Sequence, residues 1–573
     1  MSLETERHSD LKLSQRIIGL LSRSEKCRLA GVLSLTLATV AFEALGFGAV
    51  FAVIALVVGS ERDLIARWLP DLLANLSRSS QVSVTMTVLV LVFIAKHVIS
   101  LVGGWFQQGI MAKISARLGK HLFAVYMAKP YSFFTNHGTP ELFIKSQNAS
   151  LISNAFLTPI VTLTSDLLVG LALISLLLLV EVQVTLITIL LFFSVGLISH
   201  RLLRSRIETW GSVQVNLRTA ILREIQEAFS SIKELRVMSR GELVLSRYGN
   251  RLTEMAKINQ RFLAAQAIPR AFLETLAVIG ISFMVVFLTA QGRQGDEILP
   301  ILGLFAAGAF RIMPAVNRVI LALQQLRLSR PLVNEIIDDL EADFPSPRVV
   351  RPTGHTYRFQ KLTFDGISFQ YGTDLPLILD GFSAEVEAGE SLGIVGESGV
   401  GKSTLVDIAL GLQDPTAGKV FLNGESLSSR LGEWHKIVGY VPQSVFLVDA
   451  TVRENVCLGL AESDIDETKV WGALRSAQLE DFIRTLPDGL QTVVGERGIR
   501  FSGGQRQRLG IARAIYHSPD VLFFDEATSS LDDETESALL DAVDNLRKSL
   551  TIIFVTHRTS TLRVCSRVIT LRR

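Results

Sequence analysis

The chain has 573 residues, of which 48% are hydrophobic, and a formal net charge of +2. A charge so close to zero gives no support to a nucleic-acid partner or an acidic substrate. The mean hydropathy of +0.37 is too high for an ordinary soluble enzyme of this size, so we expect part of the chain to lie in a membrane. Its three cysteines, Cys27, Cys457 and Cys565, lack the spacing of a metal site or a redox pair.

Six apolar stretches in the first 330 residues are long enough to cross a bilayer, whose hydrocarbon core needs about 20 apolar residues per helix. They are residues 29–58, 82–105, 156–180, 184–203, 262–290 and 298–323. Gly, Ser and Thr recur within them and permit close helix packing in lipid. We therefore predict an all-α transmembrane domain of six helices over residues 29–330, after a short polar segment, 1–28.

Lysine and arginine are concentrated in two connections between these spans, residues 106–155 and 204–261. Such residues stay on the cytoplasmic side, so the protein is predicted to be multi-pass with both termini cytoplasmic. Residues 220–236 carry apolar side chains at helical spacing. We interpret both connections as helical extensions of the spans, each with a short transverse segment that touches the second domain. Solvated helical stalks without a signalling role are the alternative.

The connection between the first two spans contains an apolar stripe at helical spacing. Its members are Leu64, Ile65, Trp68, Leu69, Leu72, Leu73 and Leu76. This pattern over residues 63–76 is typical of a short amphipathic helix at a membrane interface, interrupted near Pro70. Such a helix would either cap the bundle or handle a lipid tail.

Ionisable residues lie inside the predicted spans, where they are costly and usually face the bundle interior or a wet cavity. They are Glu43, Lys96, His97, Arg270, Glu274, Arg311 and Arg318. Arg270 and Glu274 share a helix face and are expected to pair, and Arg311 and Arg318 also share a face. These four are the candidate substrate residues, because the guanidinium fork suits a phosphate-bearing substrate. A structural charge network is the alternative for each of them.

A proline-containing linker, residues 331–353, precedes a second domain at 354–573 in which strand and helix patterns alternate. This domain contains a complete phosphate-binding loop that follows a strand and opens a helix. The loop comprises Gly396, Glu397, Ser398, Gly399, Val400, Gly401, Lys402, Ser403 and Thr404. Successive backbone N–H groups in such a loop cradle phosphate oxygens. We expect Lys402 to reach the β and γ phosphates of ATP and Ser403 to bind Mg²⁺.

An acidic pair follows the apolar run Val521–Phe524. A run that is apolar throughout predicts a parallel strand buried on both faces. Asp525 would then complete the Mg²⁺ site with Ser403, and Glu526 would be the base that activates the attacking water.

Three further residues are predicted to join the ATP site because of their order around these motifs. His557 follows the strand pattern at 551–555 and would donate to the γ-phosphate. Gln443 follows another strand and offers its amide to Mg²⁺ or to the water. Tyr371 precedes the phosphate loop and would stack on adenine.

The run Phe501-Ser502-Gly503-Gly504-Gln505, together with the preceding motifs, resembles the ATP-binding-cassette (ABC) exporters. The resemblance covers essentially the whole chain and implies a type IV exporter fold, with a membrane domain fused before an α/β P-loop ATPase domain. It implies that the residues Ser502, Gly503, Gly504 and Gln505 contact ATP held by a second subunit, and that Asp532 lies in the segment that links the two sites. A homodimer with two ATP molecules at its interface is therefore expected.

By the same resemblance, residues 138–154 and 224–237 contain the coupling helices. Two departures from the family pattern are Phe501, where leucine is usual, and Ser530, where alanine is common. Neither position supplies a key polar group, so both are expected to be tolerated. Since Glu526 and His557 are present, both composite sites are expected to hydrolyse ATP.

Within the exporters, residues 267–274 and 310–318 resemble the PglK-type lipid-linked oligosaccharide flippases. This resemblance implies a polyprenyl-pyrophosphate oligosaccharide, or another amphipathic substrate, moved from the inner to the outer leaflet of a bacterial cytoplasmic membrane. Alternatives within the class are export of another lipid, a hydrophobic drug or a peptide. An ATP-gated regulator without transport is the alternative from another class.

Overall fold

The computed structural model describes most of the chain. The described residues are 13, 15–58, 77–180, 182–292, 295–341, 358–372, 374–527, 536–537, 540–541, 543–544, 547, 550–558 and 560–572. The chain divides into two compact units. One unit comprises Met1–Lys129 and His137–Phe344, and the other comprises Pro130–Asn136 and Pro345–Arg573. The predicted amphipathic helix at 63–76 lies outside the described residues.

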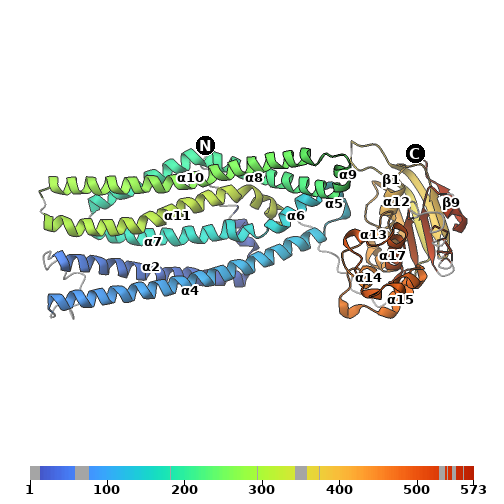
Figure 1. The fold of residues 1–573 in the computed structure, drawn as a ribbon, viewed down its shortest axis with the longest axis horizontal. Coiled ribbons are helices and arrows are strands. Elements are labelled where there is room, and N and C mark those ends of the chain that lie inside the picture. Colours follow the sequence, from blue (N-terminus) through green and yellow to red (C-terminus); the bar gives the residue numbers. More distant parts are fainter. Residues whose placement is uncertain are drawn as a thin grey trace. The chain divides into compact units, whose positions relative to one another are not determined.

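The first unit is built from long helices that run alongside one another (Figure 1). They are α2 (Arg23–Val58), α4 (Arg78–Met127), α7 (Thr158–Val180), α8 (Val182–Ser230), α10 (Gly241–Ala290) and α11 (Gly295–Glu341). Each predicted span falls on one of them, the third beginning at the end of a preceding π-helix, η2 (Ile152–Leu157). Among the described residues, four segments are apolar and long enough to cross a membrane: Arg23–Val50, Ser79–Met127, Ile152–Leu179 and Gly241–Ala290.

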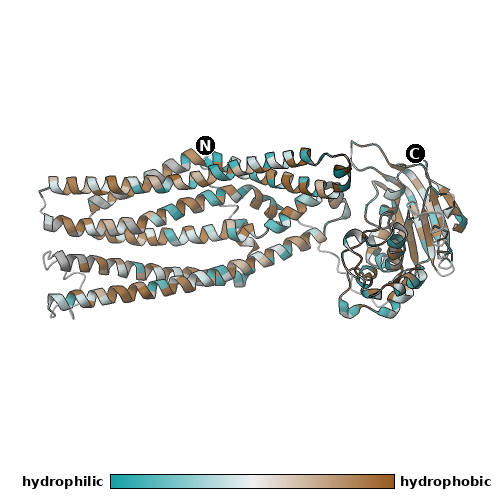
Figure 2. Cartoon of the chain, in the orientation of Figure 1, coloured by the Kyte–Doolittle hydropathy of each residue, from teal (hydrophilic) through white to brown (hydrophobic). Residues whose placement is uncertain are grey.

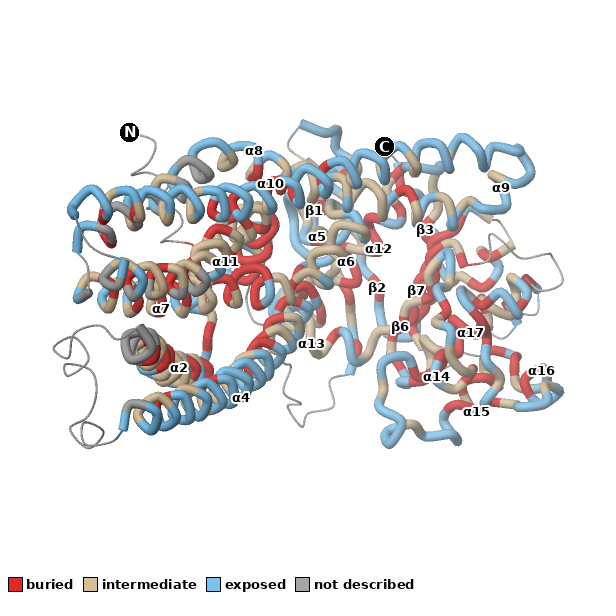
Figure 3. Tube along the Cα trace, turned by 60° about the vertical axis from the view of Figure 1, so that its left-hand side comes forward, coloured by how far each residue is buried: buried red, intermediate tan, exposed pale blue. Residues whose placement is uncertain are grey.

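Hydrophobic residues predominate along these helices (Figure 2), and many of their large apolar side chains are exposed. On α4, Leu101 is 74% and Trp105 is 81% exposed, and Figure 3 shows α4 exposed along most of its length. Lipid tails are as apolar as leucine, so close packing and polar contacts, rather than burial of apolar surface, hold such helices together. Gly211 of α8 illustrates the packing, because a Cβ there would lie 2.3 Å from the Leu328 carbonyl oxygen of α11.

The two long connections continue the spans as helices, which confirms that prediction, and carry short helices between them. These are α5 (Tyr131–Asn136), α6 (Thr139–Asn148), η2 and α9 (Ile232–Val237). The helix α9 lies in the predicted 224–237 coupling segment. The helix α5 precedes the predicted 138–154 segment and groups with the second unit. Helix α11 continues past residue 330 to Glu341, with Val333 and Ile336 buried.

The second unit contains two sheets among its described residues. The antiparallel sheet has the order β2-β1-β4-β5, formed by β1 (Lys361–Phe369), β2 (Leu379–Glu387), β4 (Ala417–Leu422) and β5 (Glu425–Ser426). The parallel sheet has the order β6-β7-β8-β3-β9, formed by β3 (Ser391–Val395), β6 (Val438–Val441), β7 (Val521–Asp525), β8 (Thr551–Val555) and β9 (Arg567–Thr570). Helices accompany these sheets: α12 (Lys402–Ala409), α13 (Leu427–Ile437), α14 (Val452–Val456), α15 (Glu467–Ser476), α16 (Glu480–Thr485) and α17 (Gly503–Ile515).

Strand β7 separates two hydrophobic cores, because successive side chains of a strand point to opposite faces. Phe523 lies in one core, edge-on to Trp434 with ring centroids 6.2 Å apart. Phe524 lies in the other core and stacks on Phe554 at 4.8 Å. All of β7 is buried, which confirms the prediction of a strand buried on both faces.

Candidate nucleotide-binding site

The parallel sheet brings three motif-bearing strands next to one another. Its order places β8 between β7 and β3, and all of these pairs are parallel. The phosphate loop follows β3, the acidic pair lies at the end of β7, and His557 follows β8. The carboxyl ends of parallel strands meet at one edge of a sheet, where open α/β sheets bind their ligands. Motifs that are far apart in the sequence are therefore gathered at one edge.

The phosphate loop, residues 396–401, wraps around the ammonium group of Lys402. The Lys402 Nζ donates hydrogen bonds to the carbonyl oxygens of Gly396 and Glu397, both at 3.0 Å. Gly401 precedes α12 with φ of +102°, and a Cβ there would lie 2.7 Å from the Ile378 side chain. Only glycine fits that backbone without strain. The loop therefore places amides at a helix N-terminus, an arrangement that favours phosphate binding.

Asp525 is buried and is hydrogen-bonded to the exposed Ser403. The Ser403 hydroxyl donates to Asp525 Oδ1 at 3.2 Å. Burial raises the pKa of Asp525, whereas the hydrogen bond from Ser403 lowers it. Burial, together with the nearby charge of Asp525, raises the pKa of Asp407 in α12 to about 6. The sequence analysis did not single out Asp407, although an acidic residue in the helix after the phosphate loop was a visible signal.

Glu526 lies among the side chains predicted to act with it. Gln443 Nε2 donates to Glu526 Oε2 at 2.9 Å. Lys402 Nζ and His557 Nδ1 lie 3.5 and 3.6 Å from Glu526 Oε1. Glu526 has φ of +47°, a left-handed conformation that costs a non-glycine residue about 1–3 kcal/mol. The backbone N–H of Glu526 donates to the Val555 carbonyl at 2.8 Å, so the neighbouring strand holds this conformation.

Tyr371 presents half of its surface to solvent, being 50% exposed. Its hydroxyl lies 3.2 Å from Thr404 Oγ1 at the start of α12. The edge-on ring of Phe369, with centroids 5.0 Å apart, supports the tyrosine ring. The structure thus joins Tyr371 to the phosphate loop and leaves ring surface available for stacking.

The residues 502–505 begin helix α17. The Ser502 hydroxyl accepts from the Gln505 N–H at 3.2 Å, and the Ser502 N–H donates to Gln505 Oε1 at 2.8 Å. This capping box satisfies two helix-terminal donors. The preceding Phe501 is buried and packs edge-on against Phe482 at 5.7 Å, so the core has room for its ring. Asp532 and Ser530 lie outside the described residues.

The candidate substrate residues have different surroundings within the membrane unit. Arg270 and Glu274 form the expected pair at 2.9 Å, with side chains 74% and 53% exposed. Arg318 forms an ion pair with Asp166 of α7 at 2.6 Å. The side chain of Arg311 lies outside the described residues. Asp166 was missed by the sequence analysis, although a carboxylate within the third span was a detectable signal.

Lys96 and Glu43 form a second ion pair, which joins α4 to α2. Their charged atoms lie 2.8 Å apart, and each side chain is 6% exposed. The Lys96 ammonium also lies over the Phe93 ring, 5.2 Å from its centroid. Both residues therefore belong to a structural pair, the alternative that the sequence analysis left open for charges in the spans.

Comparison with known proteins identifies both units. Residues 45–305 match the family model of the ABC transporter transmembrane region, and residues 379–529 match that of the ABC transporter. A Cupriavidus metallidurans protein described as an ATP-dependent lipid A-core flippase is 30% identical over 457 residues, which cover 75% of this chain and 74% of the relative. The chain belongs to the ABC transporter family.

Two further comparisons describe where this half-transporter stands in the family. The Mycolicibacterium thermoresistibile mycobactin import ATP-binding/permease protein IrtB is 34% identical over 356 residues, covering 61% of this chain and 60% of the relative. A bacterial Atm1-family ABC exporter solved with ATP bound has a TM-score of 0.79 at 21% identity, covering 96% of this chain and 93% of that one. The exporter-like fold is thus confirmed, and the transporter is an ATPase that drives transport. As a half-transporter, it works as a dimer in a membrane.

Proposed function

We propose that this half-transporter is a flippase or exporter that moves a phosphate-bearing glycolipid from the inner to the outer leaflet of a bacterial cytoplasmic membrane. The observation that carries the proposal is the assembly around Glu526 of a base, an amide, a lysine and a histidine, in a chain whose other unit is a bundle of long apolar helices. The lysine- and arginine-rich connections support cytoplasmic termini, on the side where ATP is available.

The residues of the ATP site have complementary roles in the proposed reaction. Lys402 and the amides of the phosphate loop bind the β and γ phosphates, and Tyr371 stacks on adenine. Glu526 takes the proton of the attacking water while Gln443 orients it. His557, exposed beside Glu526, donates to the γ-phosphate. These groups act by positioning and electrostatics, which supply most of the catalysis in phosphoryl transfer.

The Ser403, Gln443 and Asp525 side chains fit a magnesium ion. Asp525 is buried beside the Ser403 hydroxyl, and no lysine or arginine among the described residues forms an ion pair with it. Carboxylate, hydroxyl and amide oxygens are the ligands that this hard cation prefers. When bound, Mg²⁺ would neutralise charge on the phosphates. The raised pKa of Asp525 fits a carboxylate that gains a cation when the nucleotide binds.

A second copy of the chain completes each ATP site in this proposal. Ser502, Gly503, Gly504 and Gln505 expose the N-terminus of α17, which favours an anion, and would contact ATP bound to the partner. Asp532 would link the two sites. ATP binding then favours the closed dimer, and hydrolysis releases it, so that the membrane helices alternate between inward and outward access.

The cargo assignment rests on two resemblances. Residues 267–274 and 310–318 favour a polyprenyl-pyrophosphate oligosaccharide, and the Cupriavidus metallidurans relative is described as acting on lipid A-core. Both cargos are amphiphiles with a glycan head. Flipping keeps their hydrocarbon chains in lipid and avoids exposing them to water, which costs about 0.8 kcal/mol per CH₂.

The test is reconstitution of the full-length protein in proteoliposomes. ATPase activity and leaflet accessibility are measured with a polyprenyl-pyrophosphate oligosaccharide in one arm and lipid A-core in the other. We expect ATP-dependent appearance of one glycolipid on the far leaflet, abolished by Glu526→Gln. Robust ATPase activity with no movement of either lipid would overturn the cargo class. Movement in the opposite direction would overturn the outward assignment.

A further inference from the structure

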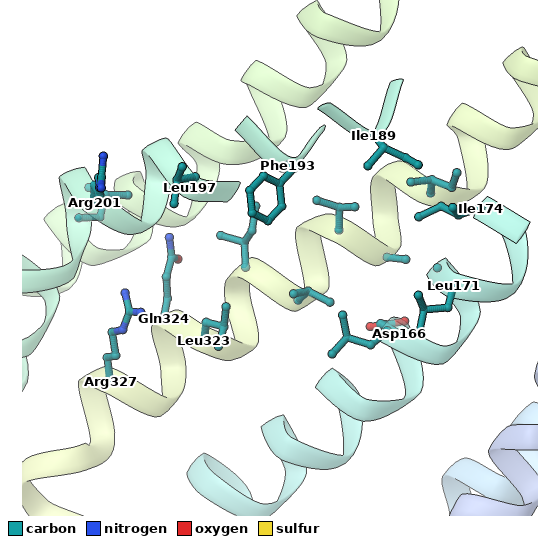
Figure 4. A pocket seen from close by; sticks show the side chains of 18 of the residues that line it. Asp166, Leu171, Ile174, Ile189, Phe193, Leu197, Arg201, Leu323, Gln324 and Arg327 are labelled. Carbon is teal, nitrogen blue, oxygen red and sulfur yellow. The ribbon is translucent and has the colours of Figure 1, made fainter. Parts of the chain in front are cut away.

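A cavity of about 540 Å³ lies within the membrane unit between α7, α8 and α11 (Figure 4). Its volume is within the roughly 300–1,000 Å³ range of small-molecule pockets. Arg270, Glu274 and Arg318 are not among its lining residues. Asp166 does line the cavity, so the cavity borders the ion pair that Asp166 forms with Arg318.

The polarity of this cavity changes along its length. Leu171, Ile174 and Ile189 lie toward one end, whereas the side chains of Arg201, Gln324 and Arg327 gather at the other (Figure 4). Asp166 also lies toward the first end, but its charge is compensated by the ion pair with Arg318. We call these two parts the apolar end and the arginine end. Helix α8 begins directly after α7, at the short connection that the proposed topology places outside. Because Arg201 lies well along α8 from that connection, the arginine end belongs to the cytoplasmic side.

Gln324 of α11 provides a second and independent observation. Its side chain lines the cavity and is 3% exposed, yet neither Nε2 nor Oε1 has a hydrogen-bond partner within the described part of the chain. A buried amide without partners is unfavourable, and such groups are rare in native proteins. The amide therefore points to a ligand that offers both an acceptor and a donor. Arg201, also at this end, forms no ion pair with any described carboxylate.

We propose that this cavity holds the cargo as it leaves the inner leaflet, an inference that rests on the proposed function. A hydrocarbon chain lies along the apolar end. A phosphate lies at the arginine end, where it accepts hydrogen bonds from Gln324 Nε2 and the guanidinium groups of Arg201 and Arg327. A hydroxyl of the glycan donates to Gln324 Oε1. This orientation matches an inner-leaflet lipid, whose head faces the cytoplasm.

The occupant is a lipid rather than a helix from a second copy of the chain. A transmembrane helix satisfies its own backbone hydrogen bonds, so it would cover the apolar wall but bring no free acceptor to the arginine end. An anionic head group supplies acceptors for both arginines. The cavity has arginines at one end and apolar side chains at the other, so it is complementary to a single amphiphilic molecule.

Gly170 allows the cavity to be filled without disturbing its surroundings. It lines the cavity, and a Cβ at this position would meet no atom within 4 Å. Gly170→Phe should therefore occupy the space meant for a hydrocarbon chain, and Gly170→Leu serves the same purpose if the larger ring prevents folding. Gly104→Phe is the matched control, because Gly104 is an exposed glycine of α4 that also has no atom within 4 Å of a Cβ.

Lipid binding is measured by native mass spectrometry of the full-length protein in detergent, with dioleoyl phosphatidic acid and dioleoylglycerol as probes. These probes share their hydrocarbon chains and differ in the phosphate. We expect the wild type to bind phosphatidic acid at least about tenfold more tightly than dioleoylglycerol, which corresponds to 1.4 kcal/mol. Gly170→Phe should lower the affinity for both lipids about tenfold, and Gly104→Phe should bind them as the wild type does.

The arginine end is tested with the same two probes. Gln324→Leu and Arg201→Gln should lower the affinity for phosphatidic acid and leave that for dioleoylglycerol unchanged. Equal affinities for the two lipids in the wild type would overturn the role of the arginine end. Wild-type lipid binding by both Gly170→Phe and Gly170→Leu would overturn the cavity as the site.

The transport assay separates this inference from the proposed function. ATP-driven flipping by Gly170→Phe at the wild-type rate would reject the cavity while the flippase assignment stands. The expected binding pattern in a wild-type protein that moves no glycolipid would retain the cavity as a lipid site and reject the transport assignment.

Discussion

Arg318 holds Asp166 through two hydrogen bonds, 2.8 Å from Nε to Oδ2 and 2.6 Å from Nη2 to Oδ1. The pair joins α11 to α7, and Asp166 is almost wholly buried, with a side chain 6% exposed, whereas that of Arg318 is 44% exposed. Paired, fork-shaped contacts of this kind are among the strongest hydrogen bonds in proteins. Arg318 is therefore engaged in structure before any substrate arrives.

We expect Asp166→Ala to destabilise the membrane unit, because it leaves a guanidinium without its counter-charge. Removing one partner of a buried pair costs about 3–5 kcal/mol, and the partial exposure of Arg318 should reduce this to about 1–3 kcal/mol. The melting temperature of the purified protein in detergent reports the change. The exchange Asp166→Arg with Arg318→Asp should restore part of the loss. An unchanged melting temperature in the single variant would show that the pair contributes nothing.

Lys96 and Glu43 should behave as one unit. Lys96→Met leaves a buried carboxylate without a partner, whereas Lys96→Met combined with Glu43→Gln removes both charges. We expect the single variant to melt at a lower temperature than the double variant. Lys26→Met, at an exposed lysine near the start of α2, is the control for loss of a lysine. If the double variant is no more stable than the single one, the two residues are not coupled.

Glu526→Gln should abolish ATP hydrolysis and retain ATP binding. The amide keeps the size of the side chain but cannot take a proton, so we expect kcat to fall by about 10²–10⁴-fold. Steady-state ATPase activity and binding of a fluorescent ATP analogue give the two readouts. Glu425→Gln, at an exposed carboxylate of β5 in the other sheet, is the control. Normal hydrolysis by Glu526→Gln would remove Glu526 from the role of base.

Asp407 should make stability depend on pH. Burial and the charge of Asp525 raise its pKa to about 6 from 3.8. The folded state thus holds this proton to a higher pH than the unfolded state, so the contribution of Asp407 to stability falls as the pH rises through this range. Asp407→Asn should raise the melting temperature at about pH 7 and have progressively less effect toward about pH 4. A difference that is constant over this range would contradict the prediction.

Ser502→Ala should weaken the start of α17. The variant loses the side-chain half of the capping box, which is worth about 1 kcal/mol. A lower midpoint of chemical unfolding reports this loss, and Ser502→Thr should recover most of it, since threonine also caps. A role in binding the partner's ATP predicts, in addition, a fall in ATPase activity that persists under conditions where Ser502→Ala is fully folded. Wild-type activity there would leave Ser502 with the capping role alone.

The motifs of the candidate ATP site could be recognised in the sequence because the requirements of a phosphate-binding loop and of a buried strand are local. Gly401 must adopt a positive φ, Lys402 must follow it, and an apolar strand must deliver Asp525 and Glu526. Each requirement restricts the residue types within a few sequence positions. The left-handed conformation of Glu526 and the raised pKa of Asp407 were not predictable, because contacts with Val555 and Asp525 from other parts of the sheet produce them.

In the membrane unit, the sequence predicts the helices, whereas the tertiary structure decides which side chains meet. Length and hydropathy alone predict the long apolar helices α2, α4, α7, α8, α10 and α11, because an unpaired backbone is too costly in lipid. Which charges meet is decided by the packing of helices far apart in the chain. That packing assigns Asp166 to Arg318 and Glu43 to Lys96.

The sequence by itself thus determined the class of protein, an ATPase fused to membrane helices, because motifs and apolar runs are local patterns. Only the tertiary structure decided where a cavity lies in the membrane unit and which residues line it. The cavity between α7, α8 and α11 and the unpartnered amide of Gln324 arise from three helices distant in sequence. No periodicity or spacing within one helix records the space that three helices leave between them.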